Sequence, residues 1–232
     1  MNNEMIIFVN KKTIQYASFT LYLGMQAIHT ALILLAAGNS SRLGRPKQLL
    51  PAGHSHLMGR MMEESGKVPF RQKVLVLGAY SSQLITNLYS NDFQLVINNQ
   101  WHQGMATSIR AGLEHVLKDP SIDQVMILLC DQPFVDASLL LRLLACSRKS
   151  TKGIIASTYA DTLGVPVVFK KPYFSYMLKM QGQGGAKQLI GRHRDDVDTV
   201  AFPNGHIDID TEEDYDAYTK NDLGHFLNKK EL

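Results

Sequence analysis

Residues Leu34–Pro51, LLAAGNSSRLGRPKQLLP, decide the fold of this chain. The apolar run Ala31–Ala36 passes directly into a loop that contains Gly38 and Gly44. A run that is apolar nearly throughout is typical of a strand covered on both faces of a sheet. Glycines in the following loop permit positive φ and let the backbone approach a ligand, so that successive N–H groups can bind an anion.

Two cations follow these glycines and suggest which anion the loop binds. Arg42 can fork onto phosphate oxygens, and Lys47 supplies a compact point charge. We predict that they cradle a triphosphate and neutralise the charge on its leaving pyrophosphate. The loop is not a Walker P-loop, because Arg45 and Pro46 separate Gly44 from the lysine, and its glycines lack the G-x-G-x-x-G spacing. The alternative is a glycine turn with solvated cations.

Short apolar runs alternate with mixed segments through the rest of the chain. We predict strands at Ala31–Ala36, Lys73–Leu77, Gln94–Ile97, Gln124–Leu129, Gly153–Thr158 and Val165–Phe169. Helices are expected at Thr107–Leu117 and Ala137–Leu144, and another from Ala186 to Gly191. This rhythm predicts a three-layer α/β/α sandwich with a mostly parallel, Rossmann-like sheet, whose ligands gather at the carboxyl ends of the strands.

An acidic residue follows another apolar strand. The segment VMILLCDQPFVD, Val125–Asp136, places Asp131 just past the strand end, where a carboxylate suits Mg²⁺. A turn or helix cap is the alternative role for this aspartate.

A pair of acidic residues lies near the carboxyl end of the chain. In GHIDIDTEEDY, residues 205–215, Asp208 and Asp210 alternate with isoleucines, so on a strand both carboxylates would face one side. A cation shared with Asp131 would relieve their repulsion. Thr211 then has the character of a helix N-cap. The alternative is a solvated strand edge that leads into a capped helix.

The composition is that of an ordinary globular protein. The 232 residues are 45% hydrophobic and 19% charged, with a net charge of +3, and nothing in the charge pattern favours nucleic acid. Cys130 and Cys146 lack the spacing of a disulfide or zinc site, which fits a reducing cytoplasm. Within residues 1–30, the segment Ile14–Ile28 is too polar and too short for a membrane span. We expect residues 1–30 to be either an extra packed element or the result of a start that belongs at Met25, followed by one domain over residues 31–232.

The segment Leu34–Pro51 resembles the signature L-A-A-G-x-S-x-R-x-G-x-x-K of nucleotidyltransferases with a MobA-like fold. The resemblance runs from about Leu32 to about Tyr218 and is strongest to the branch that contains the molybdenum cofactor cytidylyltransferases. It implies a magnesium-dependent enzyme in which Asp131, from a G-D-Q-P motif with Cys130 in place of glycine, and Asp210 hold Mg²⁺. The implied catalytic residues are Arg42, Lys47 and Asp131, and the implied nucleotide-binding residues are Leu35, Ala36, Ala37, Gly38, Arg42, Lys47, Gly104 and Ser108.

The resemblance also implies a reaction and its substrates. The enzyme would move NMP from an NTP to a phosphorylated acceptor and release pyrophosphate. Ala37, where the guanylyltransferase branch has glycine, favours CTP over GTP, and the acceptor would be molybdopterin. Partners would be these small molecules and a molybdoenzyme or its chaperone, with no nucleic acid and no membrane. A sugar- or polyol-phosphate nucleotidyltransferase, a non-catalytic cofactor-binding accessory protein and, less favoured, a dinucleotide-dependent oxidoreductase stay open.

Two positions depart from the family pattern. In the G-D-x-G-A-R segment, Gln183 replaces the acid and Lys187 replaces the arginine, so acceptor binding is expected to differ. The neighbouring Trp101 and His102 could stack on a base, although packing is the more common role of such a pair.

Overall fold

The structure, a computed structural model, describes residues 28–88 and 92–222. The expectation for residues 1–30 therefore lies outside the described residues, apart from residues 28–30. In the described ranges, no helix has the length and apolar character needed to cross a membrane.

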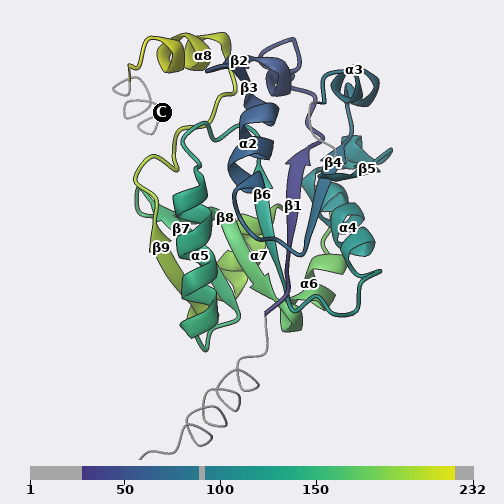
Figure 1. Cartoon of the computed structure of the whole chain (residues 1–232), viewed down its shortest axis with the longest axis vertical. Helices are drawn as coiled ribbons and strands as arrows, with labels where there is room; N and C mark the ends of the chain where they lie inside the picture. Colours follow the sequence, from purple (N-terminus) through teal and green to yellow (C-terminus); the bar gives the residue numbers. More distant parts are fainter. Residues whose placement is uncertain (1–27, 89–91, 223–232) are drawn as a thin grey trace, which may run out of the picture.

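A seven-stranded sheet forms the centre of the molecule, in the order β5-β4-β1-β6-β8-β7-β9 (Figure 1). Its strands are β1 (Thr30–Ala36), β4 (Gln72–Leu77), β5 (Gln94–Ile97), β6 (Gln124–Leu129), β7 (Ile154–Tyr159), β8 (Thr162–Lys170) and β9 (Val197–Ala201). Among the described strands of this sheet, β8 alone runs against its neighbours. The predicted mostly parallel sheet is confirmed.

The turn between β7 and β8 explains the reversed strand. Only Ala160 and Asp161 separate the two strands, and both have positive φ, 46° and 58°. Positive φ at both central residues is the signature of a tight hairpin turn of type I′. Because a two-residue connection joins only antiparallel strands, β8 must run back along β7.

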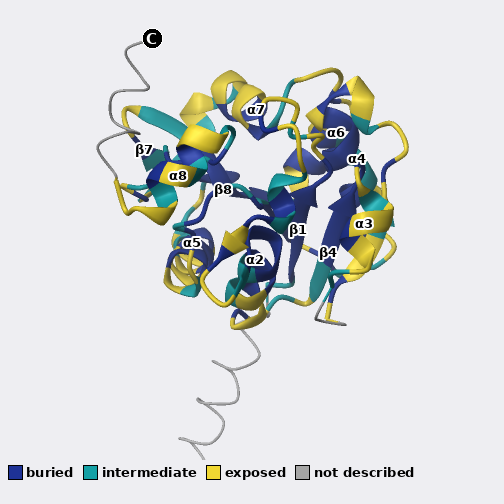
Figure 2. Ribbon diagram, turned by 90° about the horizontal axis from the view of Figure 1, so that it is seen from above, coloured by how far each residue is buried: buried dark blue, intermediate teal, exposed yellow. Residues whose placement is uncertain are grey.

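Helices cover both faces of the sheet and make the three layers that the sequence predicts (Figure 2). The α-helices are α2 (Leu57–Gly66), α3 (Ser81–Ile85), α4 (Met105–Val116), α5 (Ala137–Lys149), α6 (Phe174–Leu178), α7 (Ala186–Arg192) and α8 (Glu212–Thr219). One core cluster joins the sheet to α4, α6 and α7, and a second joins it to α2, α3 and α5. Successive side chains of β1 alternate between the two clusters, which is why the run is apolar throughout.

Several short elements lie outside the central sheet. They are the antiparallel pair β2 (Pro51–Ala52) and β3 (Ser55–His56) and the 3₁₀ turns η1 (Lys47–Leu49), η2 (Trp101–Gln103), η3 (Lys171–Tyr173) and η4 (Arg194–Asp196). Helix α8 stands beside β2 and β3 in Figure 1. Its partly buried Tyr215 and Tyr218 pack against a small apolar cluster formed by Leu43, Leu50, Ala52, Leu57 and Ile209.

The segment that carries the acidic pair is only partly as predicted. Thr211 is the N-cap of α8 and exchanges capping-box hydrogen bonds with Asp214, which confirms the predicted cap. Residues 207–210 form no strand, which corrects the expectation for Asp208 and Asp210. The predicted alternation of burial is present, because Ile207 and Ile209 are buried while Asp208 and Asp210, which alternate with them, are half-buried.

Candidate active site

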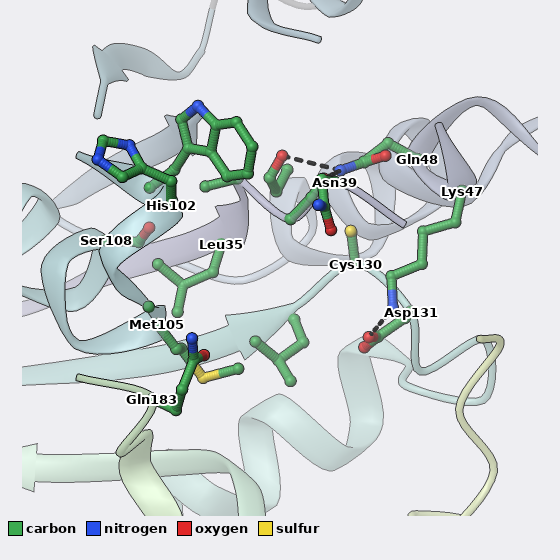
Figure 3. A pocket seen from close by; sticks show the side chains of 16 residues that line it. Leu35, Asn39, Lys47, Gln48, His102, Met105, Ser108, Cys130, Asp131 and Gln183 are labelled. Atoms are coloured by element: carbon green, nitrogen blue, oxygen red, sulfur yellow. Dashed lines mark hydrogen bonds and ion pairs between the residues drawn. The ribbon is translucent and has the colours of Figure 1, made fainter. Parts of the chain in front are cut away.

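A cavity of about 280 Å³ opens where β1 and β6 end and α4 begins. It is lined by Leu35, Ala36, Ala37, Gly38, Asn39, Lys47, Gln48, Trp101, His102, Gly104, Met105, Ser108, Leu129, Cys130, Asp131 and Gln183. Figure 3 shows Lys47 and Asp131 at one end of this cavity and His102 and Ser108 at the other. The cavity thus lies at the carboxyl ends of parallel strands, where the sequence predicts the ligand.

A buried glutamine holds the loop after β1 in place. Gln48 is fully buried, and its Nε2 donates to the carbonyls of Ala36 (3.0 Å) and Gly38 (2.9 Å). The carbonyl between them, on Ala37, accepts from the Ala79 amide at 3.1 Å. With three successive carbonyls engaged, this part of the loop has a fixed conformation.

The same loop offers unused donors and open space. In the described part of the chain, the amides of Gly38 and Asn39 donate no hydrogen bond. A Cβ added to Gly38 would meet no atom within 4 Å, and Gly38 lines the cavity. Gly44 has the predicted positive φ, 72°, and donates to the Ser40 carbonyl at 2.9 Å to close the turn. Free amides beside open space are what an anion requires of a loop.

Two cations and two carboxylates meet beside this loop. Lys47 Nζ lies 2.6 Å from Asp131 Oδ2 and 2.7 Å from Asp210 Oδ1. Arg42 Nη2 lies 2.5 Å from Asp210 Oδ2. The Ile209 amide donates to the Asp131 carbonyl at 3.0 Å and ties the two acidic segments together. Residues far apart in sequence therefore form one charged cluster.

The residues of this cluster differ in exposure. The side chains of Lys47, Asp131 and Asp210 are 13%, 15% and 18% exposed, whereas that of Arg42 is 63% exposed. Neither Arg42 nor Asp210 lines the cavity; Arg42 contacts Asp210, which in turn contacts the lining residue Lys47. The lysine and acids are thus fixed in a partly dry site, while the arginine can swing through solvent.

Burial and neighbouring charges change the acid–base properties of two groups here. Burial alone would lower the pKa of Lys47, but the charges of Asp131 and Asp210 outweigh it and raise the pKa above its usual value. Burial and the nearby Asp131 charge raise the pKa of the Cys130 thiol to about 12. At neutral pH, Lys47 is therefore an ammonium and Cys130 a neutral thiol.

The first turn of α4 forms the opposite wall of the cavity. Asn98 Nδ2 donates to the hydroxyls of Thr107 (2.8 Å) and Ser108 (2.9 Å) and fixes both side chains. Gly104, the N-cap residue, has φ 113° and ψ 170°. A Cβ there would lie 2.3 Å from the Gly182 carbonyl oxygen, so only glycine lets the loop before α7 close against α4.

A second cavity of about 190 Å³ adjoins the first and shares Leu129 and Asp131 with it. Its other lining residues are Gln132, Tyr159, Thr162, Val165, Lys187, Gly205, His206 and Asp208. Lys187 Nζ lies 5.8 Å from the centre of the Tyr159 ring. The two departures from the family pattern are therefore separated: Gln183 lines the first cavity and Lys187 the second.

The acids fit a divalent cation that also binds a substrate. Asp131 Oδ1 is buried and accepts no hydrogen bond from a described residue. No group of three or more histidine, cysteine or acidic side chains with metal-binding geometry occurs in the described part of the chain. Two carboxylates suit Mg²⁺, which commonly takes one or two carboxylates and completes its shell with substrate phosphates and water.

The structure brings most of the predicted site residues together. The lining of the first cavity includes the following predicted residues: Leu35, Ala36, Ala37, Gly38, Lys47, Gly104, Ser108 and Asp131. Arg42 and Asp210 join through the charged cluster, and Asp208 lies in the second cavity. No pattern in the sequence singles out Gln48, Asn39 or Met105, because a glutamine whose side chain donates to carbonyls earlier in the chain leaves no local signal.

Comparison with known proteins places the chain in a family. The family described as MobA-like NTP transferase domain matches residues 32–197. Nicotine blue oxidoreductase of Paenarthrobacter nicotinovorans is 31% identical over 142 residues, which cover 60% of this chain and 66% of that protein, just under two thirds of its length. Molybdenum cofactor cytidylyltransferase of Escherichia coli is 23% identical over 189 residues, which cover 79% of this chain and 92% of that protein.

A solved structure shares the fold along most of the chain. Rv0371c from Mycobacterium tuberculosis H37Rv aligns with a TM-score of 0.74 and 28% identity, covering 84% of this chain and all of that one. The same protein has been solved in complex with manganese, with a TM-score of 0.71, 26% identity and coverage of 83% and 98%. The family match spans most of the chain and contains the loop, Lys47 and Asp131. This chain belongs to the nucleotidyltransferases with a MobA-like NTP transferase domain.

Proposed function

We propose that this protein transfers CMP from CTP, with GTP as second choice, to the phosphate of an acceptor such as molybdopterin, and releases pyrophosphate. The observation that carries the proposal is the junction of the two cavities at Asp131. The first cavity offers the loop amides and Lys47 for the nucleotide. The second offers Lys187 and Tyr159 for the acceptor.

The reaction needs positioning more than it needs a covalent nucleophile. An oxygen of the acceptor phosphate attacks the α-phosphorus of the NTP in line. A bond forms between that oxygen and the α-phosphorus, and the bond to the β-bridging oxygen breaks, so that its electron pair leaves with pyrophosphate. The acceptor phosphate is already ionised, and no general base is required.

The chain's own residues would perform three tasks in this reaction. The amides of Gly38 and Asn39, with Lys47 and Arg42, would hold the β- and γ-phosphates and neutralise the charge that develops on pyrophosphate. Gly104 and Ser108 would hold the nucleoside against the first turn of α4.

A divalent cation would be held by Asp131 and Asp210, as the unpartnered Asp131 Oδ1 favours. When bound, it supplies positive charge next to the reacting phosphates. The manganese complex of Rv0371c supports a divalent ion in this fold, and we propose Mg²⁺ as the ion of this chain.

The choice of CTP rests on Ala37. Ala37 lines the cavity, at the position where the resemblance associates glycine with guanine. A Cβ on Gly78 would lie 2.7 Å from the Ala37 carbonyl oxygen and 2.9 Å from the Ala37 Cβ, so Ala37 packs closely against Gly78. The E. coli relative is named a cytidylyltransferase, which agrees with this choice.

Pyrophosphate release tests the proposal. The protein is incubated with Mg²⁺, molybdopterin and each of CTP, GTP, ATP and UTP in turn, and the product is identified by mass spectrometry. We expect one pyrophosphate per cytosine dinucleotide formed, fastest with CTP. Asp131→Asn should lower the rate at least about a hundredfold, as loss of a group that stabilises transition-state charge does. Asp195→Asn, on an exposed residue of η4, is the matched control and should keep the rate.

The rival functions give different results in the same experiment. A sugar- or polyol-phosphate acceptor is the second candidate, favoured by Lys187 in the second cavity where the family has arginine. It would give pyrophosphate with those acceptors and none with molybdopterin. Tight molybdopterin binding without pyrophosphate from any NTP would indicate an accessory protein. Consumption of NADH or NADPH would indicate an oxidoreductase.

A further inference from the structure

The ammonium of Lys47 lies where the two proposed metal ligands converge. One nitrogen contacts Asp131 Oδ2 at 2.6 Å and Asp210 Oδ1 at 2.7 Å. The side chain is 13% exposed, so water screens these contacts little. The lysine is thus an internal counterion for two acids that would otherwise repel each other.

A divalent cation and this ammonium cannot share the position. Magnesium binds carboxylate oxygens at about 2.0–2.1 Å and demands near-octahedral geometry. A nitrogen within 2.7 Å of an oxygen of each acid occupies the space that an ion bridging those oxygens would need. Its positive charge would also repel the ion at very short range. Lys47 must therefore leave before a cation can bridge Asp131 Oδ2 and Asp210 Oδ1.

The Lys47 side chain could also reach a ligand in the first cavity. Its backbone is anchored, since its amide donates to Ser40 Oγ at 3.1 Å, but the side chain has four rotatable bonds. Lys47 also lines the first cavity, together with Gly38 and Asn39, whose amides are unused in the described part of the chain. A polyphosphate on those amides would compete with the carboxylates for the ammonium.

We propose that Lys47 fills the cation position between Asp131 and Asp210 in the free protein and releases it only when a nucleotide polyphosphate draws the ammonium away. The nucleotide-free protein then binds divalent cations weakly, and polyphosphate and cation bind together. This inference rests on the proposed function for the identity of the nucleotide. The exchange of one cation for another rests on the contacts of Lys47 with Asp131 and Asp210, together with the proposed role of these acids as metal ligands.

Manganese binding, followed by the electron paramagnetic resonance signal of free Mn²⁺, tests the exchange without any turnover. Lys47→Met removes the ammonium. Nucleotide-free Lys47→Met should bind Mn²⁺ at least about tenfold more tightly than the wild type. The substitution removes the electrostatic repulsion between the ammonium and the ion, and a small change in this energy is enough for a tenfold change in Kd. Lys47→Gln, which stays polar, is the second variant in case methionine between two acids prevents folding.

Arg45 provides the matched control. It lies in the same loop and pairs with Glu212 at 2.7 Å, away from the acids that hold Lys47. Arg45→Met removes the same charge and should leave Mn²⁺ affinity within about twofold of the wild type, because exposed charges are screened. Adding Asp131→Asn to Lys47→Met should abolish the gain. Equal affinities in wild type and Lys47→Met, an equal gain in Arg45→Met, or a gain that survives Asp131→Asn would each overturn the proposal.

Addition of α,β-methylene-CTP supplies the second half of the test. It should tighten Mn²⁺ binding to the wild type well beyond the binding of Mn²⁺ by this analogue alone, and should add much less in Lys47→Met. An equal gain in both proteins would refute the coupling. A protein without CMP transfer could still show tighter Mn²⁺ binding in Lys47→Met, so failure of the proposed function and failure of this inference give distinct results.

Discussion

Replacing Gly104 by alanine is expected to destabilise the fold and to disturb the nucleotide wall. The N-cap conformation of this residue, φ 113° and ψ 170°, lies in a region essentially reserved for glycine. Forcing alanine there costs about 1–3 kcal/mol. The new Cβ would also lie 2.3 Å from the Gly182 carbonyl oxygen and 2.8 Å from the Gln183 amide nitrogen, both backbone atoms. Such overpacking costs about a further 1–3 kcal/mol.

The sum, about 2–6 kcal/mol, is a large part of the stability of an ordinary domain, about 5–15 kcal/mol. Urea unfolding measures it, and the single tryptophan, Trp101, which lines the cavity, gives the fluorescence signal. Gly191→Ala is the matched control, because a Cβ there meets nothing within 4 Å and the residue lies inside α7. It should be neutral or stabilising by up to about 1 kcal/mol. A Gly104→Ala protein within about 1 kcal/mol of the wild type would refute the reasoning.

Three further predictions concern the buried Gln48 and Cys130 and the partly buried Glu64. Gln48→Met keeps the volume but leaves two loop carbonyls without their donor, so it should cost about 1–3 kcal/mol in urea unfolding and raise the Kd for α,β-methylene-CTP in calorimetry. Burial alone would raise the pKa of Glu64, but hydrogen bonds from Lys67 and a backbone amide outweigh it and lower the pKa. The stability this provides is present above the ordinary carboxyl pKa of about 4.3 and lost as pH falls through the lowered value, so the stability gap between wild type and Glu64→Gln should close in acid. Cys130, whose thiol pKa is about 12, should resist iodoacetamide at pH 8 in the folded protein, as peptide mapping against the more exposed Cys146 would show.

Each of these predictions has an outcome that contradicts it. Unchanged stability and unchanged nucleotide affinity in Gln48→Met would mean that the loop keeps its shape without the glutamine. A stability gap for Glu64→Gln that stays constant from pH 7 into acid would remove the linkage, and Glu63→Gln, at the neighbouring half-exposed residue, controls for loss of charge alone. Alkylation of Cys130 in the folded protein as fast as in urea would show that folding does not shield this thiol, and would contradict its burial.

Most of the sheet could be predicted because its strands carry local signals. The runs at β5 and β6 have the bounds that the sequence predicts, and β1 differs by one residue. Strands buried on both faces must be apolar at every position, which a short window of sequence shows. β9 (Val197–Ala201) was missed because it is half-exposed and carries Asp198 and Thr199.

Other features depend on contacts that no local pattern contains. Helix α2 was missed because Gly59 and a run of polar residues interrupt its apolar positions. The reversed β8 follows from positive φ at Ala160 and Asp161. Aspartate adopts this conformation more readily than most residues, but alanine does not, so the pair is a weaker turn signal than Asn-Gly or Asp-Gly. For residues 207–210, a local pattern was present but was misleading. Their alternation of apolar and acidic residues predicts a strand, whereas it reflects alternating burial beside α8 without strand hydrogen bonds.

The charged cluster of Lys47, Arg42, Asp131 and Asp210 could likewise be predicted only in part. Lys47 and Asp131 were predictable as neighbours because both follow parallel strands, whose carboxyl ends share an edge of the sheet. The contact of the Lys47 ammonium with both Asp131 and Asp210 could not be predicted. Whether a lysine in this loop contacts carboxylates or is left for a phosphate depends on distances that are set only in the folded protein. The positions were therefore predictable, and the pairing was not.

A crystal structure with α,β-methylene-CTP and Mg²⁺ tests the central claim most directly. A single nucleotide should lie in the first cavity, its phosphates hydrogen-bonded to the amides of Gly38 and Asn39, with Lys47 moved from Asp131 onto the phosphates and the ion on Asp131. A nucleotide bound elsewhere, or one that leaves Lys47 between the two carboxylates and no ion on Asp131, would contradict it.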